Sequence, residues 1–421
     1  MSRSIARFFF FLVLLIPVLC FPQSVKKTFT KDTPVITGAE RLSVYLPLLR
    51  GKKVAVFANQ TSMVGKSHLV DTLKKLEVNI SVIFGPEHGF RGTADAGEKI
   101  ENAVDSLTGI PVVSLYGKKR RPSPEDLKEV DVMVFDIQDV GARFYTYISS
   151  LQEYMEAALE NGKPLLILDR PNPNGFYVDG PILDLKFKSF VGMQPIPINY
   201  GMTVGEYAMM IAGEKWLSSK IANERVTYNL TTKPTADTPF HLLVIKCKHY
   251  DHNNKYELPV KPSPNLPEMQ SIYWYPSTCL FEGTALSEGR GTDKPFQIFG
   301  HPSLPKNLYA FIPTSREGAM EPKLKDKLCY GWNISGTKEQ VLKKINGRIQ
   351  LKYLLQAYRL FPDKENFFLK TGGFNRLAGN DVLMQQIKEG KTETEIRKSW
   401  EPDLKKFKAI RKKYLLYPDF K

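Results

Sequence analysis

The fold is decided by the stretch Val82-Ile83-Phe84-Gly85-Pro86-Glu87-His88-Gly89-Phe90-Arg91-Gly92. Its apolar beginning predicts a buried strand, which glycine and proline end abruptly at a Glu-His pair. A carboxylate, an imidazole and a guanidinium therefore arrive together where a strand meets solvent. Because loops at strand ends hold polar groups that a packed core does not accept, this placement predicts a functional loop.

The segments on both sides of this stretch alternate between predicted strands and helices. Continuous apolar runs predict five strands, at 54–57, 80–84, 112–115, 132–135 and 165–168. Start and stop signals predict helices near 68–76, from Ser123-Pro124 onward, over 145–160 and from Thr203, which forms a capping box with Glu206. This alternation predicts an α/β fold with an open parallel sheet and helices on both faces.

The proline-rich segment 257–267 predicts a stiff connector between two domains, one over 40–256 and one over 258–421. In the second domain, periodic apolar residues predict helices over 341–349, 351–361, 382–388 and 400–414. The last of these helices is strongly basic on its polar face.

Residues 1–22 have the features of a signal peptide. Arg3 and Arg7 precede an apolar run from Phe8 to Cys20, which is shorter than a membrane span. We therefore expect an exported protein, periplasmic or secreted. Lipid attachment at Cys20 is the less favoured alternative, because Leu19 stands where a small residue is expected. No later apolar run has membrane length, so we expect no membrane span.

The net charge of +15 favours polyanionic partners such as nucleic acid, anionic lipid or acidic glycan, and export makes nucleic acid the least expected of them. The three cysteines that follow the predicted signal peptide, Cys247, Cys279 and Cys329, have the spacing of neither a disulfide framework nor a metal site.

Several common ligand motifs are absent from the sequence. Gln60 stands where a phosphate-binding loop ending at Gly65-Lys66-Ser67 needs its first glycine, and no strand is followed by Gly-x-Gly-x-x-Gly. The sequence also lacks Gly-x-Ser-x-Gly and His-Glu-x-x-His. We therefore expect no nucleotide, no metal and no other cofactor.

Polar residues follow four of the predicted strands. Because ligands of open α/β sheets bind outside the carboxyl ends of the strands, these residues predict a functional cleft. They are Asn59, Gln60 and Thr61; Glu87, His88 and Arg91; Asp136, Gln138, Asp139 and Arg143; Asp169, Arg170, Asn172 and Asn174. A glycine-rich loop of the second domain, with Glu282 and Arg290, has the composition of a further ligand-facing segment.

Taken together, these motifs resemble the exo-β-N-acetylmuramidase family NamZ, formerly described as a domain of unknown function. The motifs that carry the resemblance are Asn59-Gln60-Thr61, Pro86-Glu87-His88-Gly89 with Arg91-Gly92, Gly141-Ala142-Arg143-Phe144-Tyr145-Thr146-Tyr147, Asp169-Arg170-Pro171-Asn172-Pro173, Gly201-Met202-Thr203, Pro262-Ser263-Pro264-Asn265-Leu266-Pro267, Phe281-Glu282-Gly283-Thr284 and Glu288-Gly289-Arg290-Gly291-Thr292. The resemblance implies a Rossmann-like domain joined to a smaller α+β domain, with the active site in the cleft between them. It also implies release of terminal N-acetylmuramic acid from the non-reducing ends of peptidoglycan fragments. In one departure, Tyr200 stands where the family pattern has histidine.

Glycoside hydrolysis by such an enzyme needs a carboxylic acid at the leaving oxygen and a second carboxylate on the other face of the sugar. Glu87 is the predicted acid, because Phe84 and Phe90 provide apolar neighbours. Three residues stay open as its partner, namely Asp136, Asp139 and Glu282, whereas Asp169 and Arg170 are interpreted as a structural pair.

Muramic acid carries a lactyl carboxylate, which an arginine can bind through two parallel hydrogen bonds. Arg143 and Arg290 are the first predictions for this contact, with Arg91 third. Further predicted substrate-binding residues are Asn59, Gln60, His88, Tyr147 and Asn172.

Two non-catalytic functions remain as alternatives. In the first, the protein is a periplasmic binding protein that holds anionic muropeptides without cleaving them, which needs the arginines but no acid at the glycosidic oxygen. Alternatively, it adheres to anionic polymers through the basic C-terminal helix, in which case salt abolishes binding.

Overall fold

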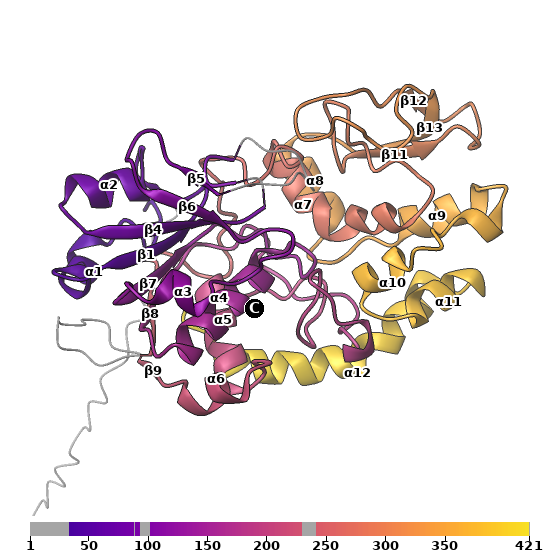
Figure 1. The fold of residues 1–421 in the computed structure, drawn as a ribbon. Helices are drawn as coiled ribbons and strands as arrows, with labels where there is room; N and C mark the ends of the chain where they lie inside the picture. Colours follow the sequence, from indigo (N-terminus) through magenta and orange to yellow (C-terminus); the bar gives the residue numbers. More distant parts are fainter. Residues whose placement is uncertain (1–32, 88, 93–101, 230–240, 421) are drawn as a thin grey trace, which may run out of the picture. The chain divides into compact units, whose positions relative to one another are not determined.

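A computed structural model describes residues 33–87, 89–92, 102–229 and 241–420. Its main element is an eight-stranded sheet with the strand order β5-β6-β4-β1-β7-β8-β10-β9 (Figure 1). The strands are β1 (Val54–Ala58), β4 (Ile80–Gly85), β5 (Ala103–Val104), β6 (Pro111–Ser114), β7 (Val132–Asp136), β8 (Leu165–Leu168), β9 (Tyr228–Asn229) and β10 (Leu242–Ile245). All neighbours pair in parallel except β5 and β6, so seven strands end at the same edge. The five predicted strands are all present, and the predicted α/β class is confirmed.

The central strands are apolar without interruption because both faces of the sheet are covered. Along β1, Ala55 and Phe57 join one hydrophobic cluster, whereas Val54, Val56 and Ala58 join the other. The same alternation runs through β7 and β8. Successive side chains of a strand point to opposite faces, so each continuous apolar run supplies two cores at once.

Helices cover both faces of this sheet. Buried residues of α1 (Leu42–Leu49) and α2 (Leu69–Lys75) join the smaller cluster on one face. The other face is covered by α3 (Pro124–Leu127), α4 (Tyr147–Glu160), α5 (Val204–Gly213) and α6 (Lys220–Arg225). The predicted capping box of Thr203 and Glu206 is present at the start of α5. A small hairpin of β2 (Met63–Val64) and β3 (Ser67–His68) precedes α2.

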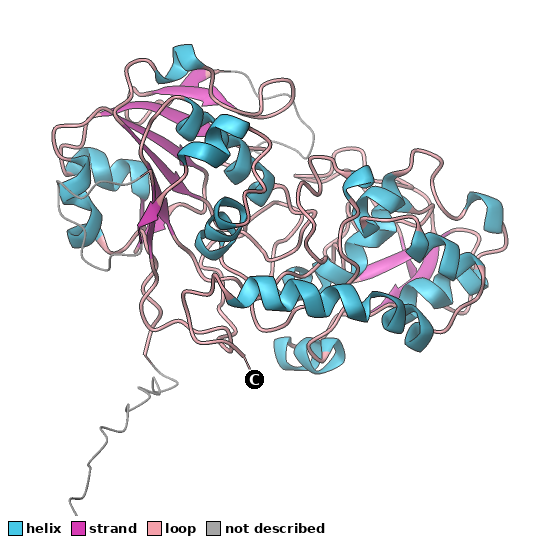
Figure 2. Ribbon diagram, turned by 90° about the horizontal axis from the view of Figure 1, so that it is seen from below, coloured by secondary structure: helices cyan, strands magenta, loops and turns pink. Residues whose placement is uncertain are grey.

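The second half of the chain is built around a three-stranded antiparallel sheet of order β11-β13-β12. Its strands are β11 (Ile298–His301), β12 (Tyr309–Phe311) and β13 (Cys329–Asn333). Figure 1 shows α7 (Met269–Thr278), α8 (Lys338–Ile345) and α9 (Lys352–Leu360) next to this sheet, whereas α10 (Gly373–Ala378), α11 (Val382–Lys388) and α12 (Glu393–Lys412) lie farther from it. Figure 2 shows the same helices and strands from below. The short 3₁₀ segments of this half are η2 (Cys279–Gly283) and η3 (Lys364–Asn366), and a further 3₁₀ turn, η1 (Leu185–Phe187), lies in the first half.

Helix α12 links this half back to the first. Its buried face contains Leu404 and Phe407, which lie within the predicted range 400–414, but the helix begins at Glu393 because Thr392 and Glu395 form a capping box that the periodicity did not reveal. Arg411 near its end donates to the carbonyl of Gly201 at 2.6 Å. In Figure 1 this yellow helix runs from α11 toward α5 and α6.

A single large hydrophobic cluster contains residues from both halves, from Phe57 of β1 to Phe407 of α12. Residues Val35–Lys421 accordingly form one compact unit. The division into domains at 257–267 stays a prediction. Of the helices that the structure describes, none is both long enough and apolar enough to cross a bilayer.

Candidate active site

A cavity of about 480 Å³ opens between the carboxyl edge of the large sheet and the second half of the chain. Its wall combines residues that follow β4, β6 and β7 with residues of α7, η2 and the loops around them. They are Glu87, Tyr116, Gly117, Arg120, Phe144, Tyr145, Thr146, Tyr147, Phe190, Val191, Ser263, Asn265, Leu266, Tyr275, Glu282, Arg290 and Phe296. Four of the predicted site residues are therefore brought together here, namely Glu87, Tyr147, Glu282 and Arg290.

Glu87 lies directly after β4, and its side chain is only partly buried. Tyr116, just beyond β6, donates its hydroxyl to Glu87 Oε1 at 3.2 Å. Burial and the Glu87 carboxylate raise the pKa of Tyr116 to about 12, so the phenol keeps its proton at neutral pH. The neighbours expected for Glu87 have other partners: Phe84 packs on Tyr154, and Phe90 packs on His68. His88 lies outside the described residues.

Glu282 belongs to η2, and its carboxylate is held by Arg290, whose Nη2 lies 2.6 Å from Glu282 Oε1. Arg290 Nε lies 3.6 Å from Glu288 Oε1, and Lys323 Nζ lies 3.0 Å from Glu288 Oε2. Burial lowers the pKa of Arg290, but the carboxylates of Glu282 and Glu288 raise it by more, and the net shift is upward. Two carboxylates and two cations thus form one balanced group at the cavity.

The backbone around this group is fixed from two directions. Lys323 Nζ donates to the carbonyls of Phe281, Glu282, Thr284 and Leu286 at 2.8–3.3 Å. Gly289 and Gly291 flank Arg290 with φ of +83° and +77°, a conformation that favours glycine. At Gly289 a Cβ would also meet the carbonyl oxygen of Ile298 at 2.4 Å. These constraints explain the glycines around Arg290 in the sequence.

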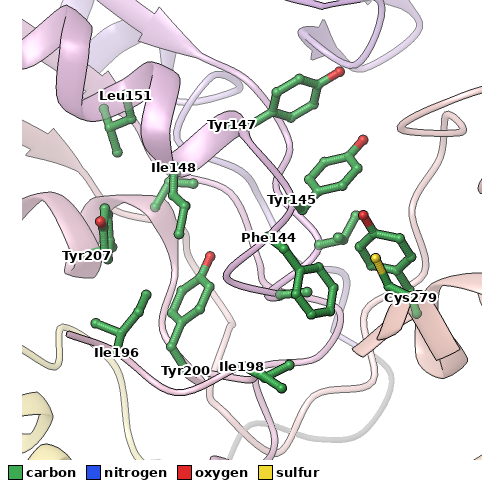
Figure 3. Packing of buried hydrophobic residues seen from close by; sticks show 14 of the residues in the cluster. Phe144, Tyr145, Tyr147, Ile148, Leu151, Ile196, Ile198, Tyr200, Tyr207 and Cys279 are labelled. Atoms are coloured by element: carbon green, nitrogen blue, oxygen red, sulfur yellow. The ribbon is translucent and has the colours of Figure 1, made fainter. Parts of the chain in front are cut away.

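Aromatic side chains form much of the remaining wall. Figure 3 shows Phe144, Tyr145 and Tyr147 along the segment that leads into α4, with Cys279 of η2 beside them. The rings of Tyr145 and Tyr147 are 4.8 Å apart, and Tyr275 lies 5.3 Å from Phe144. Such apolar faces suit the flat C–H surface of a sugar ring.

The proline-rich connector also contributes to the cavity. Tyr145 donates its hydroxyl to the carbonyl of Pro262 at 2.9 Å, and Asn265 Nδ2 donates to the carbonyl of Gly318 at 2.6 Å. Both contacts fix the segment that brings Ser263 and Asn265 to the wall.

Asn59 and Gln60 lie behind the wall and not on it. Asn59 Nδ2 donates to the hydroxyl of Tyr147 at 3.0 Å, and Gln60 Nε2 donates to the carbonyl of Pro262 at 3.1 Å. Asn59 and Gln60 were predicted to contact the substrate directly. In the structure they instead hold Tyr147 and the segment at Pro262, which form the wall.

Three further predicted site residues have structural roles instead. Arg143, expected to bind the lactyl carboxylate, is fully buried and donates to the backbone carbonyls of Pro181, Ile196 and Leu377 at 2.8–2.9 Å. Asn172 Nδ2 donates to the carbonyl of Met202 at 2.8 Å. Arg91 does not line the cavity and pairs with Asp105 at 2.9 Å and with Asp71 at 3.2 Å. A guanidinium or amide with these partners is not available to a substrate in the cavity.

The two aspartates predicted as partners of Glu87 are buried away from the cavity. Asp136 receives two hydrogen bonds from Arg170, at 2.6 and 2.9 Å. Asp139 accepts the hydroxyl of Tyr200 and, at 2.6 Å, the amide of Gly141. Of the three candidates for the second carboxylate, Glu282 alone lies on the cavity wall.

The side chains of Asp169 and Arg170 do not pair with each other, although the backbone amide of Arg170 donates to Asp169 Oδ1 at 3.0 Å. Arg170 pairs with Asp136, whereas Asp169 accepts hydrogen bonds from Thr203 Oγ1 at 2.8 Å and from the hydroxyl of Tyr417 at 2.5 Å. Both interactions still serve the packing of the sheet edge.

Asp136→Asn is expected to lower the free energy of unfolding by about 3–5 kcal/mol, because it leaves the buried Arg170 guanidinium without its counter-charge. Urea denaturation followed by circular dichroism measures this loss. The double variant Asp136→Asn, Arg170→Met should recover part of it. A single variant with parental stability but no activity would instead return Asp136 to a catalytic role.

Burial raises the pKa of Asp139 from 3.8 to about 7. The folded protein then binds a proton that the unfolded chain has released, so the stability from this group is complete below pH 4 and is lost as the pH rises toward 7. Asp139→Asn removes this titration. We expect the unfolding free energy of the variant, relative to that of the parent, to rise by up to about 1.4 kcal/mol per pH unit between pH 4 and 7. A difference that stays constant with pH contradicts the assignment.

Tyr116, Arg120, Phe190, Val191 and Tyr275 line the cavity but were not predicted as site residues. Tyr116 and Arg120 follow the third predicted strand, which is the one strand end left out of the polar set. Applying the same strand-end rule there would have found them. No group of three or more metal-binding side chains occurs among the residues that the structure describes.

Comparison with known proteins identifies the family. The model described as exo-beta-N-acetylmuramidase NamZ, N-terminal, matches residues 54–270, and the corresponding C-terminal model matches residues 273–417. The chain belongs to the NamZ family. Glu87 and Arg120 lie within the first NamZ range, whereas Tyr275, Glu282 and Arg290 lie within the second, so both NamZ models contribute to the cavity.

Individual relatives agree with this membership. Peptidoglycan beta-N-acetylmuramidase NamZ of Bacillus subtilis is 38% identical over 418 residues, which is 94% of each chain. A solved structure of a DUF1343 family protein from Bacteroides fragilis has a TM-score of 0.80 at 46% identity, over 92% of this chain and 100% of that one. A second DUF1343 family protein of the same organism has a TM-score of 0.72 at 29% identity, over 91% and 99% of the two chains.

Proposed function

We infer that the protein is an exo-acting glycoside hydrolase that removes terminal N-acetylmuramic acid from the non-reducing ends of peptidoglycan fragments. Membership of the NamZ family over nearly the whole chain supports this function. The observation that carries it is the cavity itself, in which Glu87 from one family half and Glu282 from the other line the same space.

Glu87 is the proposed general acid, which donates its proton to the glycosidic oxygen as the bond to the next sugar breaks. The Tyr116 hydroxyl orients its carboxyl group from 3.2 Å. Glu282 is the proposed second carboxylate. Arg290, 2.6 Å away, holds and directs its carboxylate, so that it can act at the anomeric carbon directly or through a water molecule.

The size of the cavity supports exo action. Ligand pockets have volumes of roughly 300–1,000 Å³. A cavity of about 480 Å³ suits one substituted hexosamine better than several rings. The aromatic side chains at its wall then pack against the terminal sugar, and the rest of the glycan lies outside.

A periplasmic binding protein without catalysis is not favoured. The relative from Bacillus subtilis is named as a peptidoglycan beta-N-acetylmuramidase, and it matches this chain over 94% of its length. A binding protein also needs no acid at the glycosidic oxygen, which is the role proposed for Glu87.

The proposed function is tested with the disaccharide in which N-acetylmuramic acid is linked to the non-reducing side of N-acetylglucosamine. We expect mass spectrometry to detect the two monosaccharides after incubation. Saturable binding of a disaccharide that stays intact would favour the binding protein instead.

We also propose that the protein is exported, on the basis of Arg3, Arg7 and the apolar run from Phe8 to Cys20, which lie outside the described residues. The peptidoglycan wall lies outside the cytoplasmic membrane, which agrees with this location. Amino-terminal sequencing of protein recovered from its own cells should find a start near residue 23. A lipid-modified Cys20 would give a membrane-bound form, and an unprocessed cytoplasmic protein would contradict export.

A further inference from the structure

Two arginines line the cavity, Arg120 and Arg290. They differ in whether carboxylates of the protein already pair with them. Arg290 is held between Glu282 at 2.6 Å and Glu288 at 3.6 Å. Within that group, Lys323 balances the remaining charge of Glu288. A substrate carboxylate would have to displace Glu282 or Glu288 to bind Arg290, which makes this arginine a poor anion receptor and a good holder of Glu282.

Arg120 is in a different situation. It is exposed to solvent and lines the same cavity. Its Nε donates to the carbonyl of Gly117 at 3.4 Å, but no carboxylate in the described part of the chain forms an ion pair with it. The adjacent Arg121, by contrast, lies within 3.5 Å of three glutamates, Glu153, Glu156 and Glu160.

Phe190 restrains the Arg120 guanidinium. The Cζ atom of Arg120 lies 4.3 Å from the centre of the Phe190 ring, in cation–π contact. A guanidinium stacked in this way keeps its planar edge for hydrogen bonding, which is the geometry that binds a carboxylate through two parallel bonds. The ordering cost of a long side chain is thereby reduced before a ligand arrives.

The position of Arg120 also relates to the chemistry. Tyr116, which contacts Glu87, lies four residues earlier on the same loop, and both side chains line the cavity. A carboxylate bound by Arg120 would therefore fix the sugar relative to the group that protonates its glycosidic oxygen. Binding energy from a group that does not react can be used to orient the substrate at the bond that breaks.

We propose that Arg120, stacked on Phe190, binds the lactyl carboxylate of the terminal muramic acid and makes the enzyme selective for a sugar that bears this charge. The proposal rests on the proposed function and replaces Arg143 and Arg290 in the predicted carboxylate contact. A peptide stem attached to the lactyl group is a second source of carboxylates.

The test compares two para-nitrophenyl glycosides, N-acetyl-β-muramide with its free lactyl carboxylate and the same compound as a lactyl methylamide. Arg120→Ala should lose about 10- to 100-fold in kcat/KM on the free acid, mainly through KM, since a hydrogen-bonded charge is removed. On the methylamide it should stay within about threefold of the parent, because no charge is left to bind. Arg120→Lys should fall between, and Arg121→Ala, which removes a charge from the same loop, should match the parent on both compounds.

Three outcomes would overturn the proposal. They are an Arg120→Ala variant with parental kinetics on the free acid, one that loses the same factor on both compounds, and a parent that cleaves acid and amide equally well. A third glycoside, whose lactyl group carries L-alanyl-D-glutamate, distinguishes the lactyl carboxylate from the carboxylates of a peptide stem. If only this compound responds to Arg120→Ala, the residue binds the peptide stem and not the lactyl group. A parent that cleaves none of the three compounds contradicts the proposed function itself.

Discussion

Glu87→Gln is expected to reduce kcat on the natural disaccharide by at least about 1,000-fold, because a general acid typically contributes a factor of 100 to 10,000 and a sugar alkoxide is a poor leaving group. The amide keeps the size of the carboxyl group and can still accept the hydroxyl of Tyr116, so the fold should be unchanged. Circular dichroism and the urea midpoint check the fold. Liberated N-acetylmuramic acid measures the rate.

The choice of leaving group makes this test specific for an acid. Nitrophenolate departs without protonation, so Glu87→Gln should lose much less activity on the para-nitrophenyl glycoside than on the disaccharide. Glu389→Gln, an exposed glutamate on the end of α11, serves as the matched control and should retain parental rates on both. Activity within tenfold of the parent on the disaccharide would remove Glu87 from the acid role.

Glu282→Ala is expected to lower kcat by about 100- to 10,000-fold on the disaccharide and on the para-nitrophenyl glycoside alike. A carboxylate that acts at the anomeric carbon is needed whatever the leaving group, so the two substrates should lose similar factors. Continuous assay of nitrophenolate and mass spectrometry of the disaccharide products measure the two rates.

Azide provides the control for this second variant. A small anion can enter the space that the carboxylate leaves and attack the anomeric carbon, so azide should restore part of the activity and yield a glycosyl azide. Glu282→Gln, which fills the space, should not be rescued. Loss of activity together with loss of folding, or equal rescue of both variants, would argue that Glu282 only supports the loop that Arg290 and Lys323 hold.

The sequence predicts the fold more completely than the site, and the reason is physical. The apolar runs of β1, β7 and β8 are continuous because each strand supplies two cores, and such a pattern is readable from composition alone. The strand-edge rule then identified Glu87, and the glycines around Arg290 marked the loop that carries Glu282 and Arg290 to the cavity. Local signals of this kind need no knowledge of distant partners.

What the sequence does not reveal is which polar residues at a strand end turn inward. Asp136 is paired with a residue 34 positions away, Asp139 with one 61 positions away, and Arg143 with a carbonyl 234 positions away. The spacing of residues along the chain does not predict contacts between positions so far apart in sequence. Arg120 was missed for the opposite reason, since in the run Lys118-Lys119-Arg120-Arg121 it looks like one solvated charge among four.

The contacts of Lys323 have a consequence for how the loop of Glu282 keeps its shape. Four carbonyl oxygens and one carboxylate surround its ammonium group, an arrangement that resembles the oxygen cage of a bound potassium ion. Here the cation is covalently attached to the chain and cannot dissociate. The loop therefore keeps this set of contacts without a metal cation from the medium.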